Sequence, residues 1–227
     1  MKPIIGIVGR VRISEDNTTM ISCFEDVRKC IIREGGIPIL ILPNQDIDYS
    51  ETNKELTNEE IEDLKAVIDK CSGIVMPGTC RLYNYDRVIY EYALSKDMPI
   101  LGICGGMQLI AINDKNLEEE KVLDYIESKI EHNNPEEKHV HKVHINKGTL
   151  LYDIIGEEEI TVNSRHRQKV NSVNKLIISG VSEDDIIEAI EYSDKKFVIG
   201  VQWHPENLYD YGTASKKIFK RFIEACK

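Results

Sequence analysis

Short apolar runs alternate with amphipathic stretches along the first half of this chain. The runs "PIIGIVG", "IPILIL", "GIVMPG" and "PILGIC" are separated by residues 23–33, 58–70 and 85–96, where apolar residues recur at helical spacing. This alternation is typical of a parallel sheet whose strands are joined by helices. We therefore expect an α/β fold with a mostly parallel central sheet that is flanked by helices.

The pattern changes after residue 108. Residues 116–131 have the spacing of a helix, with Asn116 as its cap and apolar residues every four positions on one face. "HKVHI" then begins a strand, and from Lys175 onward "KLIIS", "IIEAIEY" and "FVIGVQW" are separated by short turns. These runs predict an antiparallel meander attached to the parallel sheet, and residues 213–225 close the chain as a helix.

Length and composition limit the class of protein. The 227 residues fit a single α/β domain, residues 1–227, and 41% hydrophobic with 30% charged residues is ordinary for a soluble globular protein. No apolar run approaches the roughly 20 residues that span a bilayer, and the start "MKPIIGIVGR" turns polar too soon for a signal peptide, so we expect a cytoplasmic location. The formal net charge of −10 argues against binding to nucleic acid or membrane and favours small-molecule chemistry.

The cysteine at position 104 has the most informative surroundings. "GICGGMQ" follows an apolar run and precedes "LIA", so Gly102, Cys104 and Gly106 form the G-x-C-x-G pattern of a nucleophile elbow. Small neighbours permit a sharp turn from strand to helix, and the thiol then lies at a helix N-terminus, where free N–H groups favour a thiolate. The alternative is a cysteine that merely packs where the chain turns.

Two further segments could complete an acyl-transfer site. "GVQWHPE" places His204 and Glu206 just beyond an apolar strand, and their i, i+2 spacing lets both side chains project the same way. Glu206 could then orient an imidazole that faces the thiol. The tetrahedral oxygen needs N–H donors, for which the amide of Gly105 and, after the Pro-Gly turn in "VMPGTC", the amide of Thr79 are candidates.

Together these segments resemble the class I glutamine amidotransferase-like superfamily, and most closely its gamma-glutamyl-gamma-aminobutyrate hydrolase family. The resemblance covers most of the chain and rests on "GGIPILILP", "GIVMPG", "PILGICGGMQLIA", "HKVHINKGTLL", "VNSRHRQKV", "IEAIEY" and "FVIGVQWHPE", in that order. It implies a class I glutaminase-like fold with a flavodoxin-like core. It also implies a cysteine hydrolase of gamma-glutamyl amide bonds that needs no metal or organic cofactor.

The resemblance also assigns roles to residues. It makes Cys104 the nucleophile, His204 the general base and then acid, and Glu206 the residue that orients the imidazole. The amides of Thr79 and Gly105 are the implied oxyanion hole, and the reaction would pass through a gamma-glutamyl thioester.

Substrate-binding residues are suggested by position. Gln108 stands one helical turn beyond the nucleophile and could face the same pocket, and "NSRHRQ" matches a family motif beside the active site. Ser164, Arg165 and His166 are therefore candidates for the glutamyl end of a small-molecule substrate, with a polar loop between strands as the alternative for each.

Three departures from the family pattern concern the leaving amine. Gly105 stands where these hydrolases often carry arginine, residues 79–81 replace a glycine-rich segment, and the acidic region 113–131 replaces a Gly-Gly segment. The departures fall where the leaving amine should be recognised, so they leave the particular substrate open more than the chemistry.

Two smaller clusters have competing interpretations. "HVHKVH" supplies His139, His141 and His144, but strand alternation puts the third on the opposite face, so no metal site is expected there. Six cysteines without a CxxC pair suggest neither a zinc site nor a disulfide framework. Cys80 could be a redox partner of Cys104, but we expect a small buried residue instead.

Three functions are consistent with these residues. A free-standing gamma-glutamyl hydrolase is the leading hypothesis. A glutaminase subunit that passes ammonia to a partner synthase would use the same triad, although nothing in the chain identifies a fused synthase. A non-catalytic regulatory protein would keep only the fold. The sequence does not decide the oligomeric state, so a homodimer is also open.

Overall fold

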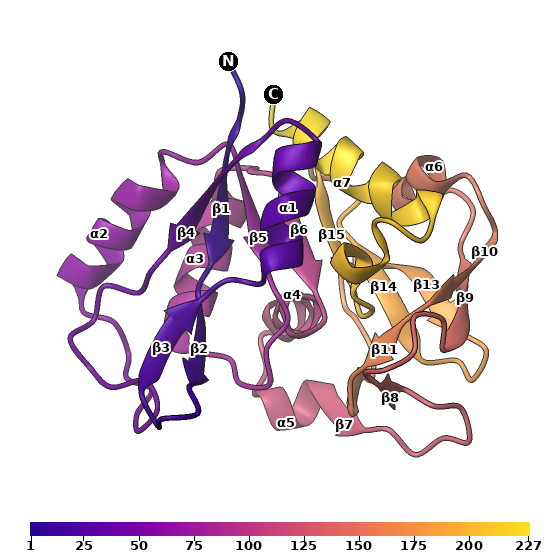
Figure 1. Ribbon diagram of the computed structural model, residues 1–227, viewed down its shortest axis with the longest axis horizontal. Helices are drawn as coiled ribbons and strands as arrows, with labels where there is room; N and C mark the ends of the chain where they lie inside the picture. The colour runs from indigo at the N-terminus through magenta and orange to yellow at the C-terminus, as the bar shows by residue number, and fades with distance from the viewer.

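A nine-stranded sheet runs through the molecule in the computed structural model, which describes residues 1–227 (Figure 1). Five adjacent strands are parallel: β15 (Val198–Val201), β6 (Ile100–Ile103), β5 (Gly73–Met76), β1 (Ile4–Val8) and β4 (Ile37–Ile41). Beyond β15 the sheet continues antiparallel through β14 (Ile187–Glu191), β13 (Ile177–Ser182), β9 (His141–Ile145) and β10 (Glu159–Val162). The predicted α/β sheet with an antiparallel meander is confirmed.

Helices cover both faces of this sheet. One face carries α1 (Glu25–Arg33), α6 (Leu150–Ile155) and α7 (Thr213–Ala225), with α1 and α7 nearest the viewer in Figure 1. The other face carries α2 (Asn58–Ile68), α3 (Asn84–Ser95) and α4 (Gly105–Lys115). The core divides into clusters of 27 and 25 buried residues, one on each face, which explains why the parallel strands are apolar at every position.

The order of the parallel strands brings three segments to one edge of the sheet. β5, β6 and β15 are neighbours, and parallel strands end on the same side. The turn after Met76, the cysteine after Ile103 and the histidine segment after Val201 therefore lie together at the carboxyl ends of the strands, where α/β sheets bind their ligands.

The segment 116–131 differs from the predicted helix. Asn116 has a left-handed backbone (φ 52°) and ends α4 instead of beginning a new helix. Only α5 (Glu119–Val122) is helical, and β7 (Leu123–Tyr125) then pairs with β12 (Gln168–Val170). The prediction is wrong because pairing with a distant strand outweighs local helical spacing, and such pairing leaves no local signal.

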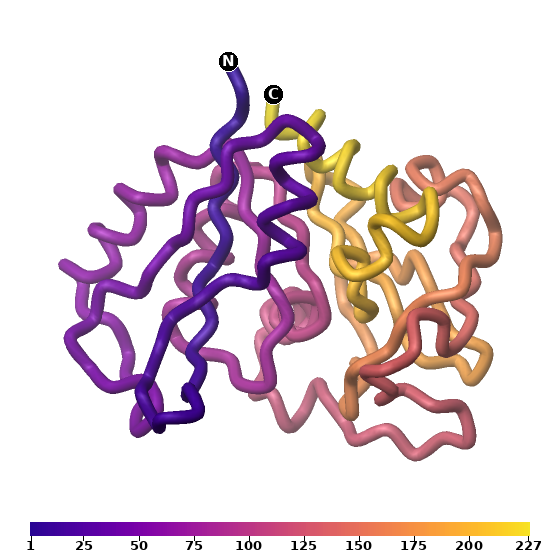
Figure 2. Tube along the Cα trace, in the orientation of Figure 1, coloured from indigo at the N-terminus to yellow at the C-terminus, as the bar shows by residue number.

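Short elements complete the chain. They are β2 (Arg10–Ile13) paired with β3 (Thr19–Ser22), β8 (Asn133–Asn134) paired with β11 (Ser164–Arg165), and the 3-10 helix η1 (Pro205–Leu208). The β2–β3 pair and α6 were not predicted. Figure 2 shows the chain between β7 and β9 running along the lower edge of the molecule before it enters the sheet.

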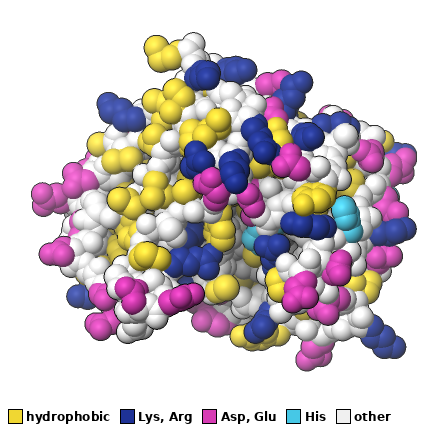
Figure 3. All heavy atoms as spheres, viewed as in Figure 1, with side chains coloured by type: hydrophobic (Ala, Val, Ile, Leu, Met, Phe, Trp, Pro, Cys, Tyr) yellow, Lys and Arg dark blue, Asp and Glu magenta, His cyan; other side chains and the backbone are white.

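The surface carries both signs of charge. Acidic and basic side chains are interspersed over the face shown in Figure 3. None of the helices combines the length and the apolar character that a membrane crossing would need.

Candidate active site

Cys104 occupies a strained turn between β6 and α4. Its backbone angles are φ 52° and ψ −108°, a conformation that typically costs a non-glycine residue on the order of 1–3 kcal/mol. The turn is held from both sides, because the Cys104 N–H donates to Val201 O (2.8 Å) and the Cys104 carbonyl accepts from Gln108 N (3.1 Å). A Cβ on Gly106 would lie 2.0 Å from Met76 O, so only glycine fits there. This geometry is that of the predicted elbow.

His204 and Glu206 form a buried pair beside this turn. The Nδ1 atom of His204 lies 2.7 Å from Oε1 of Glu206, and the two residues are 8% and 5% exposed. A carboxylate only accepts, so Nδ1 carries a proton, and Nε2 is the nitrogen available to the thiol. The imidazole of His204 and the side chain of Cys104 both border Gly78, and a Cβ added there would lie 2.8 Å from His204 Cε1 and 3.4 Å from Cys104 Cβ. The structure thus brings all three predicted catalytic side chains together.

The environment of His204 favours its charged form. Burial opposes protonation, but the carboxylate of Glu206 and the neighbouring thiol of Cys104 outweigh it and raise the pKa of His204 to about 10. These partners favour the imidazolium form of His204. Such a group can stabilise a neighbouring thiolate and can donate a proton to a departing amine.

Gly78 borders both the histidine and the cysteine. A Cβ at this position would lie 2.8 Å from Cε1 of His204 and 3.4 Å from Cβ of Cys104. Because Gly78 does not have a positive φ, its backbone can accept alanine, and the strain would fall on the imidazole ring.

Gly78→Ala should therefore lower kcat/KM for amide hydrolysis by about 10- to 100-fold, because displacing a catalytic group by a fraction of an ångström to one ångström has effects of this size. Steady-state kinetics and a thermal melt would measure activity and stability together. Gly212→Ala is the matched control, because its backbone is extended and nothing lies within 4 Å of the added Cβ. Equal kinetics in both variants would contradict the proposed position of the ring.

A buried arginine holds the turn that contains Gly78. Arg10 donates from Nη2 (2.7 Å) and Nε (3.1 Å) to the carbonyl of Pro77, and its Nη1 pairs with the buried carboxylate of Asp86. The Thr79 N–H that follows makes no hydrogen bond within the protein, and Thr79 N would lie 2.9 Å from a Cβ on Gly105. The two predicted oxyanion donors are therefore neighbours. In the sequence, the only sign that Arg10 belongs to the site was its position just after the first parallel strand.

Asn163 fixes the backbone of His204 with two hydrogen bonds. Its Nδ2 donates to His204 O (2.9 Å), and its Oδ1 accepts from His204 N (2.8 Å), with the side chain completely buried. Sequence analysis selected the three residues that follow Asn163 in "NSRHRQ" and missed this one. The available sign in the sequence was the residue type, because the side-chain amide of a buried Asn can pair with both a backbone N–H and a backbone carbonyl.

The predicted substrate-binding residues fall into two groups. Gln108 is buried near the elbow, with Nε2 3.4 Å from both Gln168 O and Gln202 Oε1. Arg165 donates from Nη1 to Asn207 Oδ1 (2.9 Å), one residue beyond Glu206, while its buried Nε has no partner.

Ser164 and His166 make up the second group, because both side chains point into a separate buried cluster. Ser164 Oγ lies 2.8 Å from His132 O, and His166 Nε2 lies 3.3 Å from His132 Nδ1. Substrate binding by all four residues stays a prediction.

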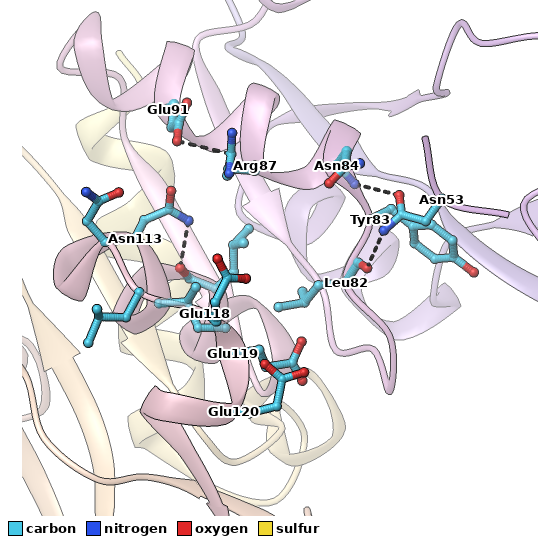
Figure 4. A pocket seen from close by; sticks show the side chains of 14 residues that line it. Asn53, Leu82, Tyr83, Asn84, Arg87, Glu91, Asn113, Glu118, Glu119 and Glu120 are labelled. Carbon is cyan, nitrogen blue, oxygen red and sulfur yellow. Dashed lines mark hydrogen bonds and ion pairs between the residues drawn. The ribbon is translucent and has the colours of Figure 1, made fainter. Parts of the chain in front are cut away.

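A polar pocket of about 390 Å³ lies next to α3, the second half of α4 and α5 (Figure 4). Its rim carries the carboxylates of Glu91 and of residues 118–120, with Arg87 as a lining cation. Cys104, His204 and Glu206 are not among its lining residues, so this pocket is not the catalytic cleft.

All six cysteines are free, and Cys80 is exposed. The prediction that Cys80 is a small buried residue is wrong, because the turn after the Pro-Gly pair carries it outward to solvent. Four of the others are buried and Cys23 is half-buried, as expected for most of them.

The peptidase C26 family model matches residues 80–206, more than half of the chain. This chain belongs to the peptidase C26 family. A glutamine amidotransferase-like protein of Rickettsia prowazekii is 32% identical to it over 259 residues, covering 87% of this chain and 86% of that one. The gamma-glutamyl-gamma-aminobutyrate hydrolase PuuD of Escherichia coli K12 is 29% identical over 255 residues, covering 99% and 94%.

The structural comparison agrees with the family. The glutaminase domain of Trypanosoma brucei CTPS, solved with bound acivicin, superimposes with a TM-score of 0.68 at 18% identity, covering 99% of this chain and 93% of that one. This likeness shows a shared fold. With the relatives above, it puts the peptidase C26 chain in the class I glutamine amidotransferase-like superfamily, as an amide-bond hydrolase or amidotransferase-like enzyme.

Proposed function

We propose that this protein is a cysteine hydrolase that cleaves gamma-glutamyl amide bonds. The observation that carries the proposal is the placement of a strained cysteine at a helix N-terminus beside a buried His–Glu pair. A cysteine that merely packed in a turn would need neither the strain nor the pair. The relative PuuD, a gamma-glutamyl-gamma-aminobutyrate hydrolase, supports the choice of substrate class.

The reaction follows from the positions of the three side chains. The Cys104 thiolate attacks the gamma-carbonyl carbon, and the carbon–oxygen double bond becomes an oxyanion. When the oxyanion collapses, the carbon–nitrogen bond breaks and His204 gives its proton to the departing amine. Water then attacks the gamma-glutamyl thioester with His204 as base, which releases glutamate and restores the thiol. Glu206 holds the imidazole in the orientation that both steps need.

The remaining groups of the site would bind the charged parts of the substrate and of the reaction intermediate. The free amides of Thr79 and Gly105 would receive the oxyanion, at the end of the turn that Arg10 holds. The unpartnered Nε of Arg165 offers a donor for the alpha-carboxylate of a gamma-glutamyl group. Gln108 would line the same site. Any contribution of Ser164 and His166 would come from their backbone, because their side chains face the histidine cluster.

The proposal is tested with the purified chain alone. A panel of gamma-glutamyl amines and free glutamine is incubated with the protein, released amine is quantified, and the acyl-enzyme is trapped by acid quench and intact-mass spectrometry. We expect turnover of at least one gamma-glutamyl amine and a glutamyl adduct that maps to Cys104.

Other outcomes would replace the proposal. Acylation by glutamine that occurs only after a synthase is added would assign the protein as an ammonia-supplying glutaminase subunit. A chain that is neither acylated nor active on any member of the panel would be a non-catalytic member of the fold.

A further inference from the structure

Four buried side chains converge in the antiparallel half of the molecule, away from the triad. His132 precedes β8, His141 begins β9, His166 follows β11 and Glu188 lies in β14, elements that Figure 1 shows in the same half of the molecule. None of the four is more than 4% exposed, and one nitrogen or oxygen from each lies within 4.8 Å of the others. We call these residues the His3Glu cluster.

The spacing of the inner atoms matches a metal centre. His132 Nδ1 lies 3.3 Å from His166 Nε2, and Glu188 Oε1 lies 3.4, 3.3 and 3.7 Å from the inner nitrogens of His132, His166 and His141. Tetrahedral zinc with bonds of about 2.0–2.1 Å places its ligand atoms about 3.3 Å apart. Four of the six separations are therefore within a few tenths of an ångström of tetrahedral edges.

The outer nitrogen of each histidine faces an atom that only accepts. His132 Nε2 lies 3.2 Å from the Asp184 carboxylate, His141 Nδ1 lies 3.3 Å from Lys142 O, and His166 Nδ1 lies 3.0 Å from Gln168 O. Each outer nitrogen therefore carries a proton, and the inner nitrogen of each imidazole is the one that can bind a metal ion. Metal-binding histidines are held in this way by a carboxylate or a backbone carbonyl.

A fully buried carboxylate lies at the centre of the cluster. Neither oxygen of the fully buried Glu188 has a hydrogen-bond partner. Ser164 Oγ lies 3.1 Å from His141 Nε2, but its single proton can instead go to His132 O at 2.8 Å. Lone pairs on the inner nitrogens and a buried carboxylate repel one another unless a proton or a metal cation lies between them.

We propose that the His3Glu cluster binds a divalent transition-metal ion, with Zn²⁺ the best match. Imidazole nitrogens with one carboxylate suit zinc, whereas Ca²⁺ and Mg²⁺ prefer all-oxygen ligands. Four protein ligands leave no open position, so the ion is structural. This inference does not rest on the proposed hydrolase activity.

The ion would join segments that support the catalytic edge. The Gln168 carbonyl accepts from His166 and also lies 3.4 Å from Nε2 of Gln108, which follows the elbow. The backbone carbonyl of Glu188 accepts from Gln202 N (2.8 Å), two residues before His204. Loss of the ion should therefore loosen β14 and the chain around residues 163–168, and lower thermal stability.

The test measures metal directly. Untagged protein purified without chelator is analysed by inductively coupled plasma mass spectrometry, then stripped with a chelator and reloaded with Zn²⁺ or with Co²⁺ as an optical probe. We expect about one zinc per chain, a lower Tm after stripping that zinc restores, and the visible absorption of tetrahedral Co²⁺ with imidazole ligands.

Paired variants separate this site from adventitious binding. His141→Gln and Glu188→Gln should reduce bound zinc at least about 10-fold, whereas His144→Gln, an exposed histidine on the same strand as His141, should leave it unchanged. Zinc that is lost equally from His144→Gln and Glu188→Gln would overturn the proposal. So would stripped wild-type protein that takes up neither Zn²⁺ nor Co²⁺, a result that does not depend on whether the variants fold.

Discussion

Cys104→Ala should lower kcat/KM for gamma-glutamyl amide hydrolysis by at least about 10⁴-fold, because removal of a nucleophile leaves only binding and oxyanion stabilisation. The variant should still fold. The side chain is small, and the hydrogen bonds that hold the turn come from its backbone N–H and carbonyl. Single-turnover kinetics and intact-mass spectrometry after acid quench would show the loss of both turnover and acyl-enzyme.

Cys80→Ser is the matched control for this variant. Cys80 is an exposed free thiol and should tolerate the change with kinetics within about two-fold of wild type. Undiminished turnover in Cys104→Ala would exclude the proposed mechanism. A loss in Cys80→Ser as large as that in Cys104→Ala would instead favour a redox or covalent role for both cysteines.

Glu206→Gln should lower kcat/KM by about 10²- to 10⁴-fold and change its pH dependence. The carboxylate is the main group that raises the pKa of His204, to about 10 in the wild type. Activity that needs the imidazolium is present below that pKa and is lost as the pH rises through it. Without the carboxylate the pKa of His204 falls, so the alkaline limb of the profile should move from near pH 10 to lower pH.

The pH profile of kcat/KM distinguishes electrostatics from simple misfolding. Glu62→Gln is the control, because Glu62 is an exposed residue that pairs only with Lys65 on the surface of α2. It should leave both limbs in place. A Glu206→Gln profile that is lower at every pH but keeps its alkaline limb near pH 10 would show that Glu206 does not set the charge of His204.

Local pattern predicted most regular elements, because each has a signal within a few residues. Residues 213–225 form the predicted terminal helix, and α2, which a Thr57–Glu60 capping box begins, lies within the predicted segment 58–70. Residues 116–131 show the limit of this reasoning. Asn116 suits the end of a helix as well as its start, and the pairing of β7 with β12 decided the segment.

The residues of the candidate site also divide into those that local patterns predict and those that only the fold reveals. The pattern around Cys104 and the segment with His204 and Glu206 could be found in the sequence, because the chemistry needs those residue types at short spacings. Arg10 and Asn163 could not be found in this way, because each acts on a carbonyl or amide that is distant in the chain. Their importance comes from burial and from the partner atom.

The histidines show most clearly what the sequence predicts and what only the fold decides. By itself the sequence determined the α/β class, the elbow and the His–Glu pair, because repeating apolar runs and short motifs are local properties of a chain. It discounted a metal at His139, His141 and His144, and alternation along one strand does separate the last two. Only the tertiary structure brought His141 to His132, His166 and Glu188, because sheet pairing places side by side residues that are far apart in the sequence.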